Sequence, residues 1–470
     1  MRTINFTILA LLSTAVPSLG CSSQSGESSD AGNGGPVAGP TFHKDVAPIL
    51  QQHCESCHAP GQIAPFSLIS YAEAKSVADL IVARTQDGSM PPWGAIDTDE
   101  CAPRFGWQHD TRLSDAELST LEAWKNAGAP EGDPADAPTG GAPKGADLTR
   151  VDLTLQPKKA FVASGDKDQL ICFVLDPQLT DDVYVNASKI VPGNLKVAHH
   201  GALFLDTLGE SVALANEDGY YECFGSVGLT ETSLLTPWVP GGQPTVFPSN
   251  AGALVPAGSK LVLQMHYHPA GTTADPDLTK LELQFHPGVP EYKAAFLAVG
   301  IPVPLPNGNG LQPGPNDENG IEFFIPAGEK AHTETSRLTL PAGSGGQPQP
   351  EMKVYSVQSH MHYVGVDEKL SVRRAAAQGS DPAEECLLQT PKWDFNWQQT
   401  YTYDAPIEDL PTLRAGDVLE VRCTYDNTMD NPFLKRALME QNLSAPMDVS
   451  FGETTLDEMC FGVINTFVKN

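Results

Sequence analysis

The chain has 470 residues, of which 40% are apolar, with 58 acidic against 29 basic side chains. This length and apolar content allow two or three domains with separate cores. The formal net charge of −29 would repel phosphate backbones and anionic lipid headgroups, so we expect no nucleic-acid partner.

The first residues have the composition of a bacterial secretion signal, in which Arg2 precedes an apolar stretch too short to span a membrane. The tetrapeptide SLGC at 18–21 resembles a lipobox, which predicts removal of residues 1–20 and lipidation of Cys21. Cleavage without lipidation is the alternative. We expect export from the bacterial cell and membrane attachment only through the lipid, facing the periplasm or the exterior, where disulfides persist.

Stretches rich in Gly, Ser and Pro divide the remaining chain: residues 21–40 form a flexible tether and residues 134–147 a linker. Residues 41–133 lie between them and are predicted to be helical. Ser114-x-x-Glu117 is a capping box that opens a helix, and Gly128 and Pro130 end it.

The region beyond residue 147 has the pattern of an all-β protein. Short runs that alternate or are wholly apolar, separated by Gly, Pro and Asn clusters, predict strands at Lys260–His266, Leu281–Phe285, Lys353–His360, Val418–Thr424 and Phe461–Phe467. The length suits two sandwiches. The predicted fold is a small all-α domain followed by two all-β, jelly-roll-like sandwich domains, at 148–290 and 291–470.

Cys54-Glu55-Ser56-Cys57-His58 fits the CxxCH pattern of covalent haem attachment, with both thiols bonded to the haem and His58 as an axial iron ligand. A CxxC disulfide or half a zinc site is the alternative, but no second CxxC lies nearby. Met90 is placed to be the second axial ligand, with His53 or His109 as rivals. Across residues 41–133 these features resemble the mono-haem cytochrome c family, which implies one covalent haem c.

Histidines in three strand-like segments form a candidate copper constellation. His360 and His362 are two residues apart, so on a strand both face the same side, while Met361 faces away. His199 and His200 are adjacent and can bind one ion only if the backbone is irregular there, which Gly201 allows. His266 is the natural third ligand.

The segments VAHHGALF, LQMHY, SHMHYVG and DEMC, in this order, resemble the four ligand motifs of the copper type II ascorbate-dependent monooxygenases. This family includes the peptidylglycine alpha-hydroxylating and dopamine beta-monooxygenases. The resemblance implies two copper ions: an electron-transferring copper held by His199, His200 and His266, and an oxygen-binding, catalytic copper. For the second copper it implies three ligands: His360, His362 and Met459. His268 could compete with His266, but the family pattern favours His266.

The resemblance also implies two disulfides, Cys423–Cys460 and Cys172–Cys223. It offers no counterpart for Cys101 and Cys386, which we expect to be unpaired. Peptide-amidating members hold the substrate carboxylate with Arg, Asn and Tyr, and those positions here are Gln358, Phe461 and Val463. A neutral or hydrophobic substrate is therefore expected in place of a glycine-extended peptide.

Together these patterns predict a copper-dependent monooxygenase that uses O2 to hydroxylate a C–H bond of a small or hydrophobic substrate. Electrons would come from ascorbate or a redox protein through the fused haem, and the linker at 134–147 would keep this donor close to the copper domains. Two alternatives remain open: a non-catalytic, exported copper and haem protein for electron transfer or copper binding, and a haem-based sensor that regulates the copper unit.

Overall fold

The computed structural model describes residues 39–139, 147–165, 168–223, 226–230, 232–268, 275–317, 319–452, 454 and 456–470. The predicted signal sequence, the lipidation of Cys21, nearly all of the tether at 21–40 and half of the linker at 134–147 lie outside these residues. Within them, no helix is long and apolar enough to cross a membrane.

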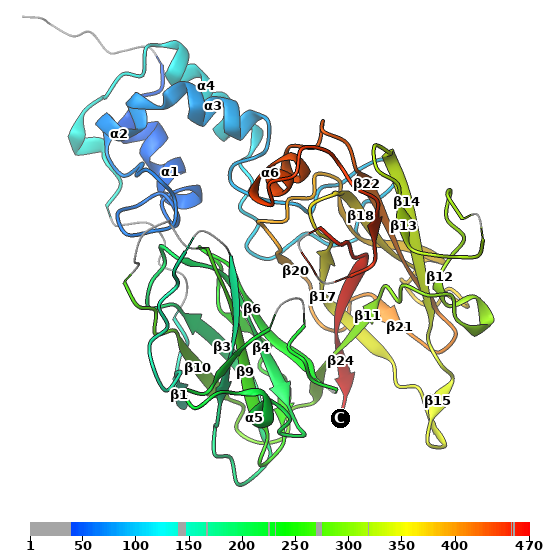
Figure 1. Ribbon diagram of the computed structural model, residues 1–470. Helices are drawn as coiled ribbons and strands as arrows, with labels where there is room; N and C mark the ends of the chain where they lie inside the picture. The colour runs from blue at the N-terminus through cyan, green and yellow to red at the C-terminus, as the bar shows by residue number, and fades with distance from the viewer. Residues whose placement is uncertain are drawn as a thin grey trace, which may run out of the picture. The chain divides into compact units, whose positions relative to one another are not determined.

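Helices dominate the first part of the described chain (Figure 1). They are η1 (Phe42–Val46), α1 (Ala47–His53), α2 (Tyr71–Ser76), α3 (Ala78–Gln86), α4 (Asp115–Asn126) and η2 (Pro134–Asp136). Helix α4 begins at the predicted capping box, where Ser114 and Glu117 each accept a hydrogen bond from the other's backbone N–H. Leu121 and Trp124 of α4 are fully buried in one apolar cluster with Phe42, which closes the helical unit.

The next strands form the first sandwich. One sheet has the order β5-β2-β9-β4-β6, and the other contains β1, β10, β3, β8 and the short β7. Their bounds are β1 (Leu153–Leu155), β2 (Gln169–Leu175), β3 (Val183–Val191), β4 (Ala198–Asp206), β5 (Tyr220–Glu222), β6 (Ser233–Trp238), β7 (Thr245–Val246), β8 (Ala251–Val255), β9 (Lys260–Tyr267) and β10 (Lys280–Phe285), with the short helix α5 (Ser211–Leu214). Apolar side chains from both sheets, such as Leu203, Leu263 and Leu281, form one core.

The second sandwich carries the larger core. Its sheets have the orders β12-β14-β22-β18-β19 and β11-β24-β17-β20. The bounds are β11 (Tyr292–Val299), β12 (Gly310–Leu311), β14 (Lys330–Thr339), β17 (Met352–His360), β18 (Gly365–Arg373), β19 (Glu384–Thr390), β20 (Thr400–Thr402), β22 (Val418–Asp426) and β24 (Phe461–Lys469). Peripheral elements are η3 (Pro306–Gly308), β13 (Phe324–Ile325), β15 (Gly343–Ser344), β16 (Gln347–Pro348), β21 (Thr412–Leu413), β23 (Val449–Ser450) and α6 (Pro432–Glu440).

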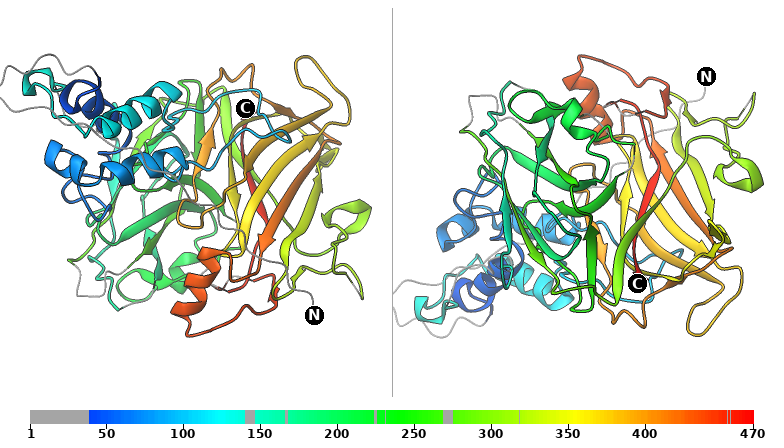
Figure 2. Two further views of the ribbon diagram at one scale, coloured as in Figure 1. Left: turned by 90° about the horizontal axis from the view of Figure 1, so that it is seen from above. Right: turned by 90° about the horizontal axis from the view of Figure 1, so that it is seen from below.

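The two sandwiches share a sheet. Strands β8 and β11 pair in parallel, with Tyr292 opposite Ala251 and Lys293 opposite Gly252. This short pairing joins the two inner sheets into one path of hydrogen-bonded strands, and Figure 2 shows the green and the yellow-to-red strands from above and below. The predicted pair of β-sandwiches is thus consistent with the structure.

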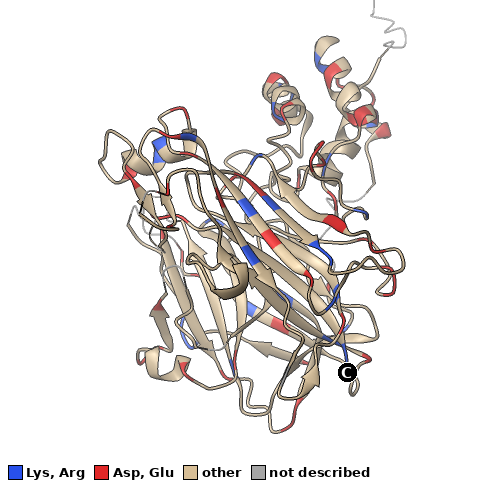
Figure 3. Cartoon of the chain, turned by 90° about the vertical axis from the view of Figure 1, so that its right-hand side faces the viewer, with Lys and Arg blue, Asp and Glu red and all other residues tan. Residues whose placement is uncertain are grey.

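Charged side chains gather on the outer sheet of the second sandwich. Figure 3 shows acidic and basic residues side by side on its strands. Arg337 on β14 pairs with Glu420 on β22 at 2.6 Å, and Arg422 pairs with Asp367 on β18 at 3.1 Å. These pairs neutralise one another locally, although the chain as a whole is strongly acidic.

Residues 93–108, which we name the strap, leave the helical unit between α3 and α4 and pack onto the second sandwich. Trp107 stacks on Tyr403 with ring centroids 4.9 Å apart, and Ala95 and Trp107 belong to the core of that sandwich. The Ile96 N–H donates to the carbonyl of Gln389. The strap therefore belongs structurally to the second sandwich, although its sequence lies inside the helical segment.

A disulfide between Cys101 of the strap and Cys386 of β19 fixes this arrangement. The prediction that these two cysteines are unpaired is wrong, because the strap brings together positions 285 residues apart that no sequence motif connects. The two predicted pairs, Cys172–Cys223 and Cys423–Cys460, are also disulfides in the structure. Three disulfides among the described residues fit an oxidising compartment.

Candidate metal centres

His199 and His200 lie at the beginning of β4, next to a break in its pairing with β9. The register shifts between Ala198 and His200, so the backbone is irregular there, as predicted for two adjacent ligands. His200 lies opposite His266 on β9. A Cβ at Gly201 would lie 2.6 Å from Met265 Sδ, so glycine lets the two strands approach closely beside the histidines.

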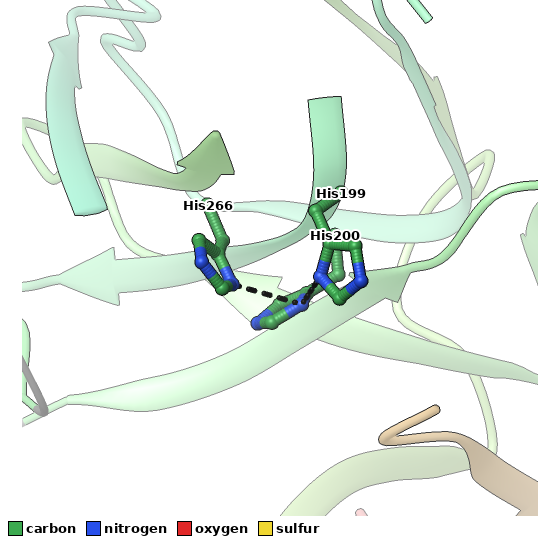
Figure 4. A group of neighbouring side chains, drawn as sticks. All are labelled: His199, His200 and His266. Carbon is green, nitrogen blue, oxygen red and sulfur yellow. Dashed lines mark hydrogen bonds between the residues drawn. The ribbon is translucent and has the colours of Figure 1, made fainter. Parts of the chain in front are cut away.

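The three imidazoles converge through their Nδ1 atoms (Figure 4). His199 Nδ1 lies 3.0 Å and His266 Nδ1 lies 3.4 Å from His200 Nδ1. Nitrogens about 2.0–2.1 Å from one metal ion are about 3–3.4 Å apart at ordinary coordination angles. The three side chains could therefore hold one metal ion.

Burial keeps this centre in the protonation state that metal binding needs. Burial, followed by the nearby His266 ring, lowers the pKa of His199 to about 3. Burial and the neighbouring histidines also lower the pKa of His200 well below its usual value. Imidazole binds metals in its neutral form, so these two ligands need no deprotonation at neutral pH.

Asp168 orients the third ligand from outside the cluster. Its carboxylate lies 2.9 Å from His266 Nε2 and 2.6 Å from His268 Nδ1. Burial acts to raise the pKa of Asp168, but the hydrogen bonds from both histidines outweigh it and hold the pKa well below the usual range. A carboxylate on the outer nitrogen fixes the tautomer of a metal-binding histidine, so His266 presents Nδ1 to the centre while His268 remains a half-exposed neighbour.

His360 and His362 are prepared as a second pair of ligands. His360 Nδ1 lies 2.7 Å from Gln398 Oε1, and His362 Nδ1 lies 3.0 Å from the carbonyl oxygen of Asp457. Both oxygens accept a hydrogen bond from Nδ1–H, which leaves Nε2 as the nitrogen of each ring that could bind a metal. The ring centroids are 5.5 Å apart, and burial lowers the pKa of His360 to about 4.

β17 ends at His360, so His362 lies just beyond the strand. Met361 between them is fully buried in the core of the second sandwich and points away from the pair, as predicted.

Met459 differs from the other buried methionines. Met265, Met352 and Met361 each belong to an apolar cluster, whereas buried Met459 belongs to none of the clusters found among the described residues. Its carbonyl accepts from Tyr425 Oη at 2.9 Å, and the adjacent Cys460 is in a disulfide. The backbone of Met459 is thus held from both sides, while its buried side chain lies outside the apolar clusters of the described residues.

Glu458 ties Met459 to the His-x-His segment. This fully buried carboxylate accepts from the backbone N–H groups of His362, Val364, Gly365 and Met459. Burial raises the pKa of Glu458 to about 8, against the lowering effect of these four hydrogen bonds.

A second buried carboxylate, Glu368 on β18, accepts from the His360 N–H at 3.1 Å. Both histidines of the pair therefore have their main chain fixed by a carboxylate.

The CxxCH segment lines a cavity of about 1000 Å³. Cys54 and Cys57 are free thiols, and burial raises the pKa of Cys54 to about 12, so it is a thiol and not a thiolate at neutral pH. His58 Nδ1 lies 3.1 Å from the carbonyl oxygen of Phe66, which leaves Nε2 free.

Met90 lines the same cavity as these residues. His53, a rival axial ligand, has both ring nitrogens engaged, with Thr111 at 2.9 Å and Glu117 at 3.1 Å. His109 also lines the cavity and stays open as an alternative.

The three positions predicted to face a substrate come together beside His360. Gln358 pairs across the sheet with Val463, and His360 pairs with Phe461. Residues that oppose one another, or lie two apart, share one face of a sheet, so all four side chains project on the same side. Gln358 accepts a hydrogen bond from Thr400. Gln358, Phe461 and Val463 are all uncharged, so none of them could pair with a substrate carboxylate.

One part of the chain is similar in sequence to a known monooxygenase. The chain is 25% identical over 163 residues, 33% of its length, to peptidyl-glycine alpha-amidating monooxygenase A of Xenopus laevis. Part of this chain is similar to a monooxygenase. The match covers 17% of the length of that protein, and no family model matches the chain.

Solved structures resemble the chain only weakly. Cowpea mosaic virus empty particles align over 67% of this chain and 88% of theirs at TM-score 0.22 and 11% identity. A peptide-N(4)-(N-acetyl-beta-D-glucosaminyl) asparagine amidase aligns over 63% of this chain and 99% of its own at TM-score 0.19 and 12% identity. Scores this low identify no shared fold.

The supporting residues around both centres were not predicted. Asp168, Gln398, Glu458 and Glu368 hold the candidate ligands, but they are single acidic or amide residues in loops and strands with no spacing pattern. Only Glu458 had a signal, since it lies directly beside Met459 in the DEMC motif.

Proposed function

We propose that this protein is an exported copper-dependent monooxygenase that uses O2 to hydroxylate a C–H bond of a neutral or hydrophobic substrate. The observation that carries the proposal is the convergence of three Nδ1 atoms in one centre, beside a separate His pair whose Nδ1 atoms are both held by oxygen acceptors. The partial similarity to an amidating monooxygenase supports it.

The donor sets fit copper. Three neutral imidazoles could also hold zinc, but two imidazoles with a thioether favour copper that cycles through Cu(I). Copper bound at the two centres would supply electron transfer at the first and oxygen activation at the second. We assign His199, His200 and His266 to the first, and His360, His362 and Met459 to the second.

The protein's own residues would do the positioning. Asp168 and Gln398 hold the imidazole rings in one tautomer, so no proton has to leave a ligand when the metal binds. Glu458 and the Cys423–Cys460 disulfide hold the Met459 segment. Fixed ligands lower the reorganisation that each change of oxidation state requires.

The substrate would lie on the face formed by Gln358, Phe461 and Val463 beside His360. A charged carboxylate placed there would lose water without gaining a cationic partner among these side chains, which is costly. Phe395 adds apolar surface beside the pair, with its ring centroid 6.0 Å from that of His362. These contacts favour a neutral or hydrophobic substrate.

The helical unit would carry one covalent haem c. Its cavity is of the size that encloses cofactors, two free thiols and the free Nε2 of His58 face it, and Met90 lies on its wall. Each hydroxylation needs two electrons beyond those of the substrate C–H bond. We propose that ascorbate or a redox protein supplies them by way of this haem.

With residues 1–20 removed, a lipid on Cys21 would hold the protein at the membrane.

Metal analysis tests the proposal directly. The wild-type protein should hold two copper ions and one haem per chain and should hydroxylate a substrate with consumption of O2. Met459→Ala should remove the thioether, abolish hydroxylation and leave the first copper and the haem in place.

Met429→Ala is the matched control, because Met429 is exposed and lies outside both centres. Oxygen uptake without any hydroxylated product, in wild type and across a broad substrate screen, would instead support a non-catalytic copper and haem protein. Full hydroxylation by Met459→Ala would refute the ligand assignment.

A further inference from the structure

We infer that the loop 239–242, which connects β6 to β7 in the first sandwich, docks the haem-attachment segment and links it to the first copper centre. The inference rests on the proposed function, because it concerns the route by which electrons reach that centre. It adds a specific contact surface to a donor that would otherwise be held near only by its linker.

The contact is made by Gly241 and leaves little room for a side chain. A Cβ at Gly241 would lie 3.1 Å from Cys57 Sγ and 3.2 Å from Ser56 Oγ. The backbone of Gly241 also has φ +75, a conformation that favours glycine. The loop backbone therefore lies directly against the sulfur atom that would carry the haem.

The loop continues directly into the strands of the copper centre. Trp238, the last residue of β6, pairs with Gly201 of β4, the residue after His200. His200 in turn lies opposite His266 on β9. Hydrogen-bonded backbone thus runs from the loop to two of the three ligands.

The same cavity connects the two ends of this route. Its wall includes Cys57 and Met90 of the helical unit, Trp238 and Gly241 of the first sandwich, and His199 of the candidate copper centre. A transfer along this route moves one electron and no proton, with the iron going from ferrous to ferric as copper goes from Cu(II) to Cu(I).

A competing route leads to the second centre. Gln399 donates to the carbonyl of Pro92, two residues after Met90, and its neighbour Gln398 contacts His360. This route passes through two side chains and starts at a carbonyl, whereas the loop touches the attachment sulfur itself. We therefore assign electron entry to the first centre.

Substitutions on both sides of the contact test the inference in the holoprotein. Gly241→Val fills the contact from the loop side, and Ser56→Tyr fills it from the helical unit without changing a residue of either sandwich. Gly258→Val is the matched control, since Gly258 has φ +79 in the same sandwich but nothing within 4 Å of its Cβ position.

Stopped-flow oxidation of the reduced haem by the bound copper is the first measurement. Both contact variants should slow this haem oxidation by roughly tenfold or more. The haem domain would then be held near the copper only by its linker, and its effective concentration at the loop would fall. Gly258→Val should match the wild type. Hydrogen exchange is the second measurement: residues 54–58 and 238–242 should exchange faster in both contact variants only.

The outcomes separate the loop from the proposed function. Wild-type transfer rates and exchange in both contact variants, with haem-to-copper transfer intact, would overturn the loop assignment and leave the proposed function standing. If electrons from the haem reduce the second copper before the first, the loop assignment is wrong and the route through Gln398 is favoured. A wild type whose reduced haem never reduces copper would overturn both the loop assignment and the haem's role.

Discussion

One buried carboxylate joins the two segments that would bind the second copper. Glu458 accepts from the N–H of its neighbour Met459 and from the N–H of His362, which lies 96 residues before Glu458 in the chain. An acidic side chain is rarely fully buried without a partner, and here four N–H donors offset part of the cost of burial. The ligand geometry therefore depends on a residue that would not touch the metal.

Glu458→Gln should disrupt the second centre. The amide offers one acceptor oxygen and places an NH₂ group among backbone donors, so N–H groups lose their acceptor at a cost of about 1–3 kcal/mol each. Metal analysis should show copper falling from two ions per chain to one, with a lower unfolding temperature. Glu291→Gln, at an exposed position, is the control. Two retained coppers and an unchanged unfolding temperature would contradict this role.

At the scale of elements, the strap is held by an ion-pair network as well as by its aromatic residues. Arg104 pairs with Asp381 at 2.8 Å and with Glu385, and both carboxylates also contact Arg374, whose side chain is fully buried. Removing one cation leaves two nearly buried carboxylates with fewer donors.

Arg104→Ala should lower the free energy of unfolding by about 1–3 kcal/mol, the cost of leaving buried acceptors without donors. Urea unfolding of the full chain measures it. Arg112→Ala is the matched control, because Arg112 pairs with Asp110 near the surface and such pairs contribute about 0–1 kcal/mol. Equal effects of the two substitutions would show that the network does not stabilise the strap.

Elements with local signals were predictable from the sequence. The capping box placed α4, and alternation placed β9, β17 and β24 within a residue or two. The register shift at His199 and His200 meets the condition that the sequence set for two adjacent residues to bind one ion.

The strap was not predictable. Residues 93–108 have neither helical nor strand periodicity, and their partners lie in β19 and β20, almost 300 residues later. Contacts of that kind depend on tertiary packing, which leaves no local pattern. The same reason explains why Asp168, Gln398 and Glu368 were missed, although the candidate ligands beside them were predicted from motifs.

At the scale of the whole molecule, the Cys101–Cys386 disulfide should contribute strongly to stability. Cys101→Ser with Cys386→Ser should lower the free energy of unfolding by about 3–5 kcal/mol, since the loop that the disulfide closes is long. Limited proteolysis should then cut within the strap. Cys172→Ser with Cys223→Ser is the comparison, because that disulfide lies within the first sandwich and its loss should leave the strap protected. A strap equally resistant in both double variants would contradict the prediction.

This disulfide also makes the chain a covalent ring between positions 101 and 386, and that ring contains all of the first sandwich. A single backbone cut inside the ring leaves every fragment on one molecule under oxidising conditions, and reduction separates the fragments. An extracellular protease that nicks one loop of the first sandwich would therefore not detach the three-histidine centre from the second sandwich. For an exported protein, the cross-link preserves the pairing of the two centres after damage to the chain.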